Sequence, residues 1–174
     1  MKVLILGGAG MVGRNLALRL VADGALGGQP VEELTLFDVV PADVHGSGRT
    51  RVVAKTGDIS DRATVDALVA ERPEVIFHLA AVVSGEAEAD FDKGYRINLD
   101  GTRLVFEAIR ALGDYHPRVV YTSSIAVFGA PFPEAIGDEF LTAPMTSYGT
   151  QKMIGELLLN DYSRRGICDG VGIR

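Results

Sequence analysis

Tyr148 and Lys152 are the residues of this chain whose types and spacing point most directly to chemistry. Four positions apart on a helix, they would share one face, with the lysine ammonium close to the phenol. That positive charge favours the phenolate form of the tyrosine, which is the condition for a phenol to act as an acid or base near neutral pH. The pair is therefore a candidate device for moving the proton of an alcohol.

Two serines, Ser123 and Ser124, precede this pair at the end of an apolar run. A serine hydroxyl beside the phenol would hydrogen-bond the same substrate oxygen and hold it in line. Taken singly, the tyrosine and lysine fit an amphipathic surface pair, and the serines fit a turn or helix cap. Together, and downstream of a glycine-rich turn, they favour redox chemistry on an alcohol, with Ser124, Tyr148 and Lys152 as catalytic residues.

The glycine-rich turn runs from Gly7 to Gly13, directly after the first apolar run. Gly7 permits a tight turn, Gly10 lets a pyrophosphate approach the backbone, and Gly13 lets helix and strand pack closely. Met11 and Val12 open the helix that follows, whose free N–H groups and positive dipole end attract phosphate. This pattern predicts a dinucleotide-binding turn.

Two aspartates end later apolar runs. Asp38 can accept hydrogen bonds from the ribose hydroxyls of the adenosine and would repel a 2′-phosphate, which favours NAD over NADP. No arginine follows it to bind such a phosphate, since the next residues are Val39, Val40 and Pro41. Asp58, followed by Ile59, either reaches the adenine edge or caps a helix that begins near Ser60, and both interpretations stay open.

Short apolar runs alternate with helical stripes along the chain. The runs lack polar alternation, which is typical of strands buried on both faces of a parallel sheet, and cover residues 3–6, 34–37, 51–54, 75–77, 119–121 and 171–173. The helical stripes lie at 12–21, 65–69, 97–112 and 154–162. This order predicts an α/β fold, a Rossmann-type doubly wound parallel sheet with helices on both faces. Residues 24–33, 39–48 and 129–146 are predicted loops, and the third is a candidate lid or substrate wall.

Composition sets limits on the class of protein. With 174 residues, 47% of them hydrophobic, the chain suits one compact domain, and its net charge of −6 argues against nucleic acid or an anionic membrane as partner. The single cysteine, Cys168, excludes a disulfide framework and favours a reducing compartment, so we expect the cytoplasm. The apolar start is too short for a signal peptide or a membrane span. The histidines lack metal-ligand spacing, so no metal is predicted.

Taken together, these motifs resemble the extended short-chain dehydrogenases/reductases, the family of NAD-dependent epimerases and dehydratases. The resemblance follows the family's order over the whole chain and rests on Gly7, Gly10, Gly13, Asp38, Asp58-Ile59, His78-Leu79-Ala80-Ala81, Asn98, Ser123-Ser124, Tyr148 and Lys152. It implies NAD as the cofactor, with a cleft lined by Leu79, Ala80 and Ala81. It further implies that Asn98 helps to hold the site, that Ser123 lies behind the nicotinamide, and that Tyr148 and Lys152 also contact the cofactor.

The chain departs from the family pattern in two places. Leu6 replaces the threonine that usually precedes the glycines, which leaves the glycine geometry intact. Ile125 and Ala126 stand where the dehydratases of the family carry an acidic pair, so no carboxylic acid is present there to expel water. Dehydratase chemistry is therefore disfavoured.

Within the family, residues 84–96 and 128–133 resemble the D-erythronate dehydrogenases, which oxidise the C2 hydroxyl of a four-carbon sugar acid with NAD. The resemblance implies that Ser84, Ser124 and Tyr148 bind substrate, although Ser84 as plain sequence fits a solvated loop and helix cap. A nucleotide-sugar epimerase with tightly held NAD, and a nucleotide-binding module without turnover, are the alternatives.

Family members continue well beyond the last apolar run. We therefore expect residues 1–174 to be an NAD-binding Rossmann domain that is incomplete at its C-terminal end and lacks the substrate-binding lobe. The resemblance also implies a homodimer, paired through the helices at residues 98–112 and 148–162.

Overall fold

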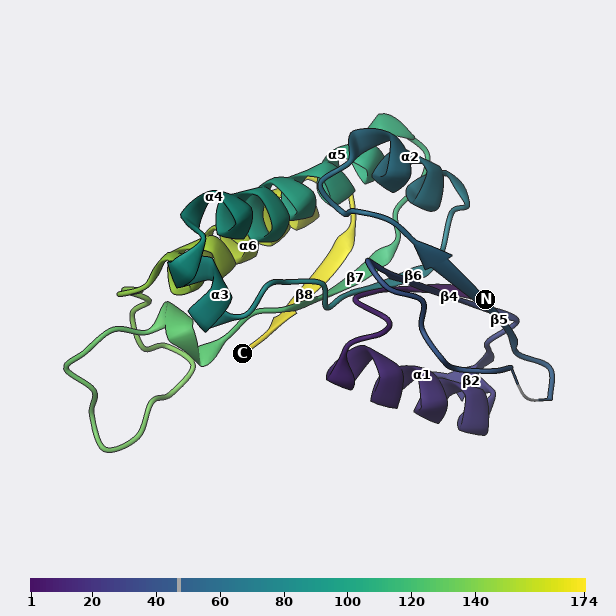
Figure 1. Ribbon diagram of the computed structural model, residues 1–174, viewed down its shortest axis with the longest axis horizontal. Coiled ribbons are helices and arrows are strands. Elements are labelled where there is room, and N and C mark those ends of the chain that lie inside the picture. Colours follow the sequence, from purple (N-terminus) through teal and green to yellow (C-terminus); the bar gives the residue numbers. More distant parts are fainter. Residues whose placement is uncertain (47) are drawn as a thin grey trace.

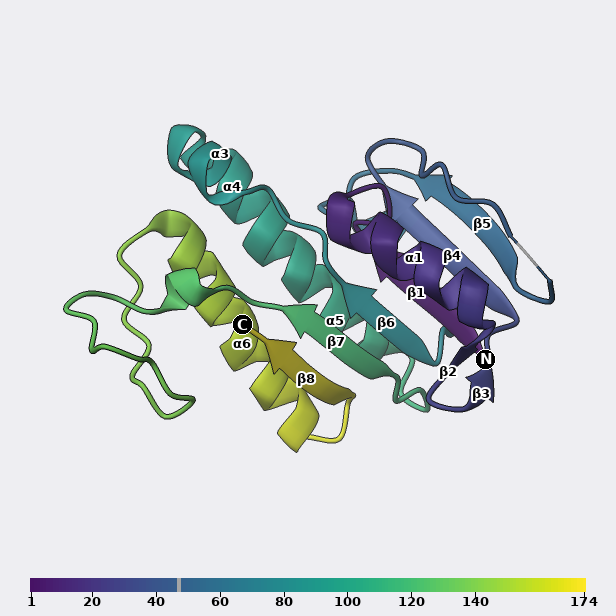
Figure 2. The ribbon, with the colours of Figure 1, turned by 90° about the horizontal axis from the view of Figure 1, so that it is seen from below.

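The computed structural model describes residues 1–46 and 48–174. Within these residues, six parallel strands form one sheet in the order β5-β4-β1-β6-β7-β8 (Figures 1 and 2). Their bounds are β1 (Lys2–Leu6), β4 (Glu33–Asp38), β5 (Arg51–Thr56), β6 (Val75–His78), β7 (Arg118–Thr122) and β8 (Asp169–Ile173). The chain starts in the middle of the sheet, runs to one edge and then to the other, so the predicted doubly wound sheet is confirmed.

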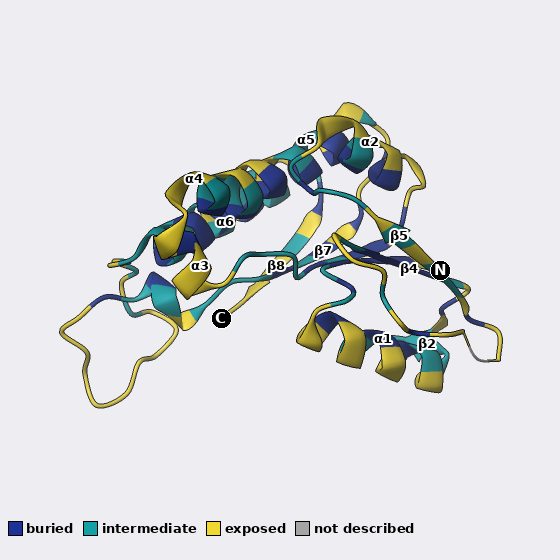
Figure 3. Cartoon of the chain, viewed as in Figure 1, coloured by how far each residue is buried: buried dark blue, intermediate teal, exposed yellow. Residues whose placement is uncertain are grey.

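Helices cover both faces of the sheet. Figure 1 shows α1 (Met11–Asp23) alone on one face, with α2 (Arg62–Ala70), α5 (Thr102–Ala111) and α6 (Ser147–Arg164) on the other. The side chains of β1 alternate between these layers: Val3 and Ile5 pack with α1, while Leu4 and Leu6 join the opposite core. Because both layers are apolar, the central strand lacks polar alternation. Figure 3 shows the helices buried toward the sheet and exposed away from it.

Two short segments differ from the sequence prediction. The predicted loop 24–33 contains an antiparallel hairpin, β2 (Ala25–Leu26) and β3 (Gln29–Pro30). The segment 84–96, which reads as a solvated loop with a helix cap, contains α3 (Ser84–Ala89) and α4 (Phe91–Gly94). Elements of two to six residues are too short to establish a hydrophobic period, which explains why the pattern missed them.

The stripe predicted at 97–112 is not one regular helix. Residues Tyr95–Gly101 form a π-helical turn that leads into α5. Gly101 lies so close to Ile59 that a Cβ atom would come within 2.9 Å of its Cγ2. Single π-helical turns occur often at functional sites, and this one carries Arg96 and Asn98.

Residues 129–146 follow a short 3-10 helix (Ile125–Val127) and form a loop, as predicted. The loop is closed at its base by a hydrogen bond from the Ala143 N–H to the Val127 carbonyl at 2.9 Å. Its role as a lid or substrate wall stays a prediction. Among the described residues, no helix combines the length and apolar character needed to cross a membrane.

Candidate active site

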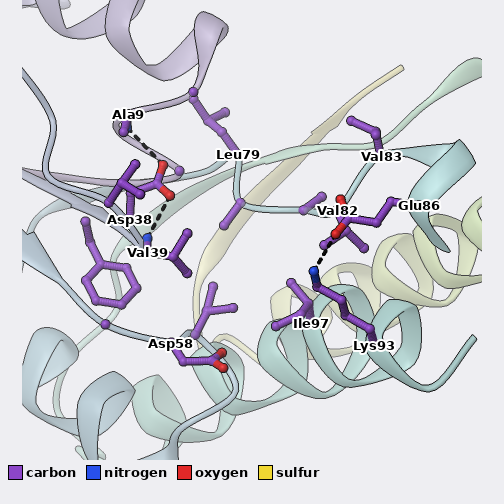
Figure 4. A pocket seen from close by; sticks show the side chains of 18 of the residues that line it. Ala9, Asp38, Val39, Asp58, Leu79, Val82, Val83, Glu86, Lys93 and Ile97 are labelled. Atoms are coloured by element: carbon purple, nitrogen blue, oxygen red, sulfur yellow. Dashed lines mark hydrogen bonds and ion pairs between the residues drawn. The ribbon is translucent and has the colours of Figure 1, made fainter. Parts of the chain in front are cut away.

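A cavity of about 620 Å³ opens at the carboxyl ends of the strands (Figure 4). Carboxyl ends of neighbouring parallel strands meet at one edge of the sheet, where the order of connections reverses and ligands bind. The predicted cofactor residues that line the cavity are Gly7, Gly10, Asp38, Asp58, Ile59, Leu79, Ala80 and Ala81. The other predicted site residues lie outside its lining: Met11, Val12, Gly13, Ser84, Asn98, Ser123, Ser124, Tyr148 and Lys152.

The glycine turn has the geometry of an anion cradle. Gly7 has a φ of +89°, and a Cβ atom on Gly13 would lie 2.1 Å from the Gly7 carbonyl oxygen, so both positions require glycine. A Cβ atom on Gly10 would lie 3.4 Å from its nearest protein atom, the Gly7 carbonyl oxygen, so packing within the protein does not require glycine there. The missing side chain leaves the outer side of the turn open to a ligand. No side chain among the described residues caps the start of α1, and its first N–H groups can bind a phosphate. These features fit the pyrophosphate of a dinucleotide.

Asp38 ends β4 beside this turn. Its Oδ2 accepts a hydrogen bond from the Ala9 N–H at 2.9 Å, and its Oδ1 accepts one from the Val39 N–H at 2.7 Å (Figure 4). A carboxylate has roughly four acceptor positions, so both oxygens keep a lone pair for ribose hydroxyls. Val39 and Val40 line the same part of the cavity and offer no charge to a 2′-phosphate.

Asp58 lies one strand further, after β5. Its Oδ1 accepts hydrogen bonds from the N–H and the hydroxyl of Ser60 at 2.8 and 2.6 Å. Burial raises the pKa of Asp58, but the hydrogen bonds from Ser60 and Arg96 outweigh it and hold the pKa below its usual value. The helix-cap alternative for Asp58 is wrong, because Asp61 caps α2 and accepts from the Thr64 N–H at 2.9 Å.

Asn98 is buried behind the cavity wall and acts on it through the backbone. Its Oδ1 accepts from the Val82 N–H at 2.8 Å, while its Nδ2 donates to the Val82 carbonyl at 3.1 Å and to Gln151 Oε1 at 2.8 Å. These contacts tie the segment after β6 to α6. That Asn98 helps to bind the cofactor stays a prediction. In this geometry it would act indirectly, by positioning Val82 in the cavity wall.

Tyr148 and Lys152 lie next to each other on α6, as their spacing predicts. Lys152 is 3% exposed, and its Nζ donates to the Thr122 carbonyl at 2.8 Å. The same Nζ lies 5.8 Å from the centre of the Tyr148 ring and 5.0 Å from that of Tyr121. Burial lowers the pKa of Lys152 to about 8. The lysine charge is thus held against the phenol ring at the end of β7.

The segment that carries Ser124 packs against the first turn of α6. Ser124 Oγ accepts from the Ala126 N–H at 3.1 Å and so begins the 3-10 helix. Gly149, the residue after Tyr148, is packed so closely that a Cβ would lie 2.1 Å from the Ala126 carbonyl oxygen. The turns that bear the serine and the tyrosine are therefore in direct contact.

Glu156 completes this end of the site and was not among the sequence predictions. It accepts a hydrogen bond from the Ser123 hydroxyl and forms an ion pair with Arg174, whose Nε and Nη2 lie 2.9 and 2.7 Å from its two oxygens. Lys152 and Glu156, one helical turn apart on α6, thus hold the consecutive residues Thr122 and Ser123. The i, i+4 spacing from Lys152 was the available signal for Glu156.

His78 is fully buried and packs edge-on against Tyr121. Thr102 Oγ1 donates to the Asn98 carbonyl at 2.7 Å, so it must accept from His78 Nε2, 2.9 Å away. Nδ1 then carries no proton, and it has no hydrogen-bond partner among the described residues. Burial, with the charge of Lys152 as a second cause, lowers the pKa of His78 to about 3, so the imidazole is neutral.

Ser84 lies at the exposed start of α3. The cap position of that helix belongs to Val83, so Ser84 is not the helix cap that its sequence suggested. Its predicted part in substrate binding stays a prediction. In the part of the chain that the structure describes, no cluster of three or more His, Cys, Asp or Glu side chains is placed to hold a metal ion.

Comparison with known proteins connects this geometry to a family. Residues 3–174 match the model of the NAD dependent epimerase/dehydratase family. The chain is 51% identical over 178 residues to the D-erythronate dehydrogenase of Cupriavidus necator, with 100% of this chain and 54% of that protein covered.

Solved structures give the same result for the fold. The crystal structure of the nucleoside-diphosphate-sugar epimerase from Agrobacterium tumefaciens is similar at a TM-score of 0.96 and 62% identity, over 100% of this chain and 52% of that one. UDP-glucose 4-epimerase from Brucella ovis, in complex with NAD, gives a TM-score of 0.78 at 29% identity, over 98% of this chain and 50% of that one. The chain spans about half the length of these proteins.

Proposed function

Because the chain belongs to the NAD dependent epimerase/dehydratase family, we propose that the protein is a dehydrogenase that oxidises the C2 hydroxyl of D-erythronate, or of a related small sugar acid. The observation that carries this proposal is the contact of the buried Lys152 ammonium with the Tyr148 ring, next to the turn that bears Ser124. The identity of 51% to a D-erythronate dehydrogenase supports the choice of substrate.

The residues of the chain divide the work between binding and proton transfer. The glycine turn and the start of α1 bind the pyrophosphate, Asp38 binds the ribose, and Asp58 lies beside the adenine ring. When bound, NAD supplies the acceptor for the hydride that leaves the alcohol carbon. Tyr148, as phenolate, takes the alcohol proton, and Ser124 donates a hydrogen bond to the same oxygen.

Lys152 and His78 set the charge at this position. The lysine stabilises the phenolate, and its hydrogen bond to the Thr122 carbonyl fixes the ammonium in place. The neutral imidazole adds no second positive charge beside it, so the lysine keeps its proton near neutral pH. Ile125, at the position of an acidic residue in dehydratases, supplies no group that could expel water.

A nucleotide-sugar epimerase is the second candidate, favoured by the 62% identity to the Agrobacterium tumefaciens structure. Such an enzyme would keep NAD bound through its cycle and return the hydride to its substrate. The two candidates therefore differ in whether NADH leaves the enzyme.

The test is to mix the full-length protein with NAD and D-erythronate and to follow NADH by its absorbance. We expect NADH in proportion to D-erythronate consumed, and none with UDP-sugars. A protein that binds NAD but forms no NADH from D-erythronate or related aldonates would refute the dehydrogenase. Conversion of a UDP-sugar to its epimer without free NADH would establish the second candidate.

We also propose that the protein acts in the cytoplasm as a homodimer. The buried free thiol of Cys168 supports a reducing compartment. Contacts between α5 and α6 support a paired helical surface, on which Leu157 is 56% exposed. Light scattering of the full-length protein tests the oligomeric state: a dimer mass would support the homodimer, and a monomer mass would refute it.

A further inference from the structure

Arg96 is a cation on the wall of the cofactor cavity to which the sequence analysis assigns no role. It lies on the π-helical turn Tyr95–Gly101, with its side chain half exposed, and it reaches Asp58 at the end of β5. Its Nη1 donates to Asp58 Oδ2 at 2.7 Å and to Ser60 Oγ at 2.5 Å. Arg96 and Asp58 both line the cavity.

The contacts of Asp58 leave little acceptor capacity free. A carboxylate has roughly four acceptor positions. Two of them, on Oδ1, take the N–H and hydroxyl of Ser60, and a third, on Oδ2, takes Arg96. One position remains, on Oδ2, and the other three contacts fix its direction. A group with one fixed anionic acceptor position is suited to recognise a single N–H donor.

The position of Asp58 along the cavity indicates which part of the dinucleotide it meets. The glycine turn ends β1, Asp38 ends β4, and Asp58 follows β5, so the three sites lie in sequence across neighbouring strands. With pyrophosphate at the first and ribose at the second, the nucleobase lies at the third. Ile59 and Ile97 line the cavity there and offer apolar contacts to a flat ring.

We propose that Arg96 makes the site selective for adenine, by fixing Asp58 as a single acceptor for the exocyclic amino group of the base. A base with a carbonyl in place of that amino group would set an oxygen against the carboxylate and would be rejected. Arg96 also helps to keep Asp58 ionised, so that the carboxyl group cannot itself donate a hydrogen bond. The inference rests on NAD as the cofactor and is independent of the substrate.

Lys93 provides a matched control. It lines the same cavity and is also a cation on this side, but it forms an ion pair with Glu86 (Figure 4). Replacing Lys93 therefore changes the charge of the cavity without releasing Asp58. Any effect that follows from charge alone will appear in both variants.

The experiment measures dissociation constants of the full-length protein for NAD and for deamino-NAD, in which hypoxanthine replaces adenine, by titration calorimetry. We expect wild type to prefer NAD by roughly 10-fold or more. In Arg96→Gln the preference should fall to within about threefold, because the freed carboxylate no longer presents one fixed acceptor. Lys93→Gln should weaken both ligands by a similar factor and keep the preference.

Three results would overturn the proposal: wild type that binds both dinucleotides equally, Arg96→Gln that keeps the wild-type preference, or Lys93→Gln that loses it. If Arg96→Gln does not fold, Arg96→Met, which keeps a long side chain without a donor, gives the same test, since loss of the preference supports the proposal and its retention refutes it. Binding requires no turnover. A failure to oxidise D-erythronate would therefore not affect the proposal about Arg96. Equally, a refutation of the proposal about Arg96 would not affect the proposed dehydrogenase activity.

Discussion

Lys152 keeps its positive charge in a position where burial works against it. Its ammonium is 3% exposed and is held by one carbonyl and by contacts with two aromatic rings. Burial without a carboxylate partner costs free energy, and the lowered pKa of Lys152, about 8, records that cost. The fold thus holds a buried cation 5.8 Å from the centre of the Tyr148 ring, where the proposed proton transfer takes place.

Replacing Tyr148 with phenylalanine tests this arrangement. The variant removes the hydroxyl that takes the proton, so we expect turnover to fall by roughly 100-fold or more, with the NAD dissociation constant largely retained. The rate of NADH formation and NAD titration give the two quantities. Tyr162→Phe is the control, because Tyr162 lies on the same helix but bonds Glu107, away from the site. Near-wild-type turnover in Tyr148→Phe would remove the tyrosine from the mechanism.

His78 should make the stability of the protein depend on pH. Its pKa is about 3 in the folded protein against 6.5 ordinarily, so between these values the unfolded chain binds a proton that the folded chain does not. The contribution of His78 to the free energy of unfolding is therefore fully present above pH 6.5 and is lost as the pH falls toward 3. From the pKa difference, the loss between pH 7 and pH 5 is about 2 kcal/mol.

Urea unfolding at pH 7 and pH 5 measures this dependence. We expect His78→Gln to be less stable than wild type at pH 7 but to lose less stability on acidification. His116→Gln, which changes an exposed histidine, should keep the wild-type dependence. An unchanged dependence in His78→Gln would show that other groups titrate in this range.

At the scale of elements, α6 is the part of the fold that assembles the proposed catalytic end. It presents Tyr148, Lys152 and Glu156 at intervals of four residues, and these meet the ends of β7 and β8. The close approach depends on Gly149, at its first turn, where the Ala126 carbonyl leaves no room for a Cβ. The contact at Gly149 therefore sets the distance between the first turn of α6 and the turn that bears Ser124.

Gly149→Ala should separate these two turns. The new Cβ would meet a backbone oxygen, which cannot move away as a flexible side chain would, so we expect a loss of roughly 1–3 kcal/mol in unfolding free energy and a fall in turnover. Thermal unfolding and NADH formation measure the two effects. Gly85→Ala in α3 is the control, since its Cβ would meet nothing within 4 Å. Equal behaviour of the two variants would show that the contact at Gly149 is not tight.

The sequence predicts the elements that repeat a pattern and misses those that do not. Each predicted apolar run lies within a strand, and in β1 and β4 burial on both faces explains the uninterrupted apolar signal. The expectation of burial on both faces is wrong for β5 and β8, because these strands form the two edges of the sheet and are largely exposed. The four residues of α4 are too few to show a period. In the site, the motif residues are local patterns, whereas Arg96 and Glu156 act through ion pairs with Asp58 and Arg174, on other elements. The partners in these pairs are 38 and 18 residues apart, so the sequence does not show that they meet, and only the spacing of Glu156 from Lys152 was a local signal.

For the whole molecule, the site is divided into two parts, the cavity and the proposed catalytic residues. Asp38 and Asp58 line the cavity from the β4-β5 side, and residues 79–83 after β6 line it from the other side, while Ser124 follows β7 and Tyr148 and Lys152 lie on α6. Asn98 connects the two parts, because it binds both Val82 at the cavity wall and Gln151, which lies between Tyr148 and Lys152 on α6. A ligand that reaches both parts should therefore order more of the chain than one that fills the cavity alone.

Hydrogen exchange with two ligands tests this division. AMP offers the base, ribose and one phosphate, so we expect it to slow exchange near the glycine turn, Asp38 and Asp58. NAD should slow exchange there and also at residues 122–127 and 147–152, because its nicotinamide end extends to β7 and α6. Mass spectrometry of the full-length protein with each ligand near saturation would locate the protected peptides. If AMP protected residues 147–152 as strongly as NAD, the two parts would respond as one unit and the site would not be divided as the cavity and the catalytic residues indicate.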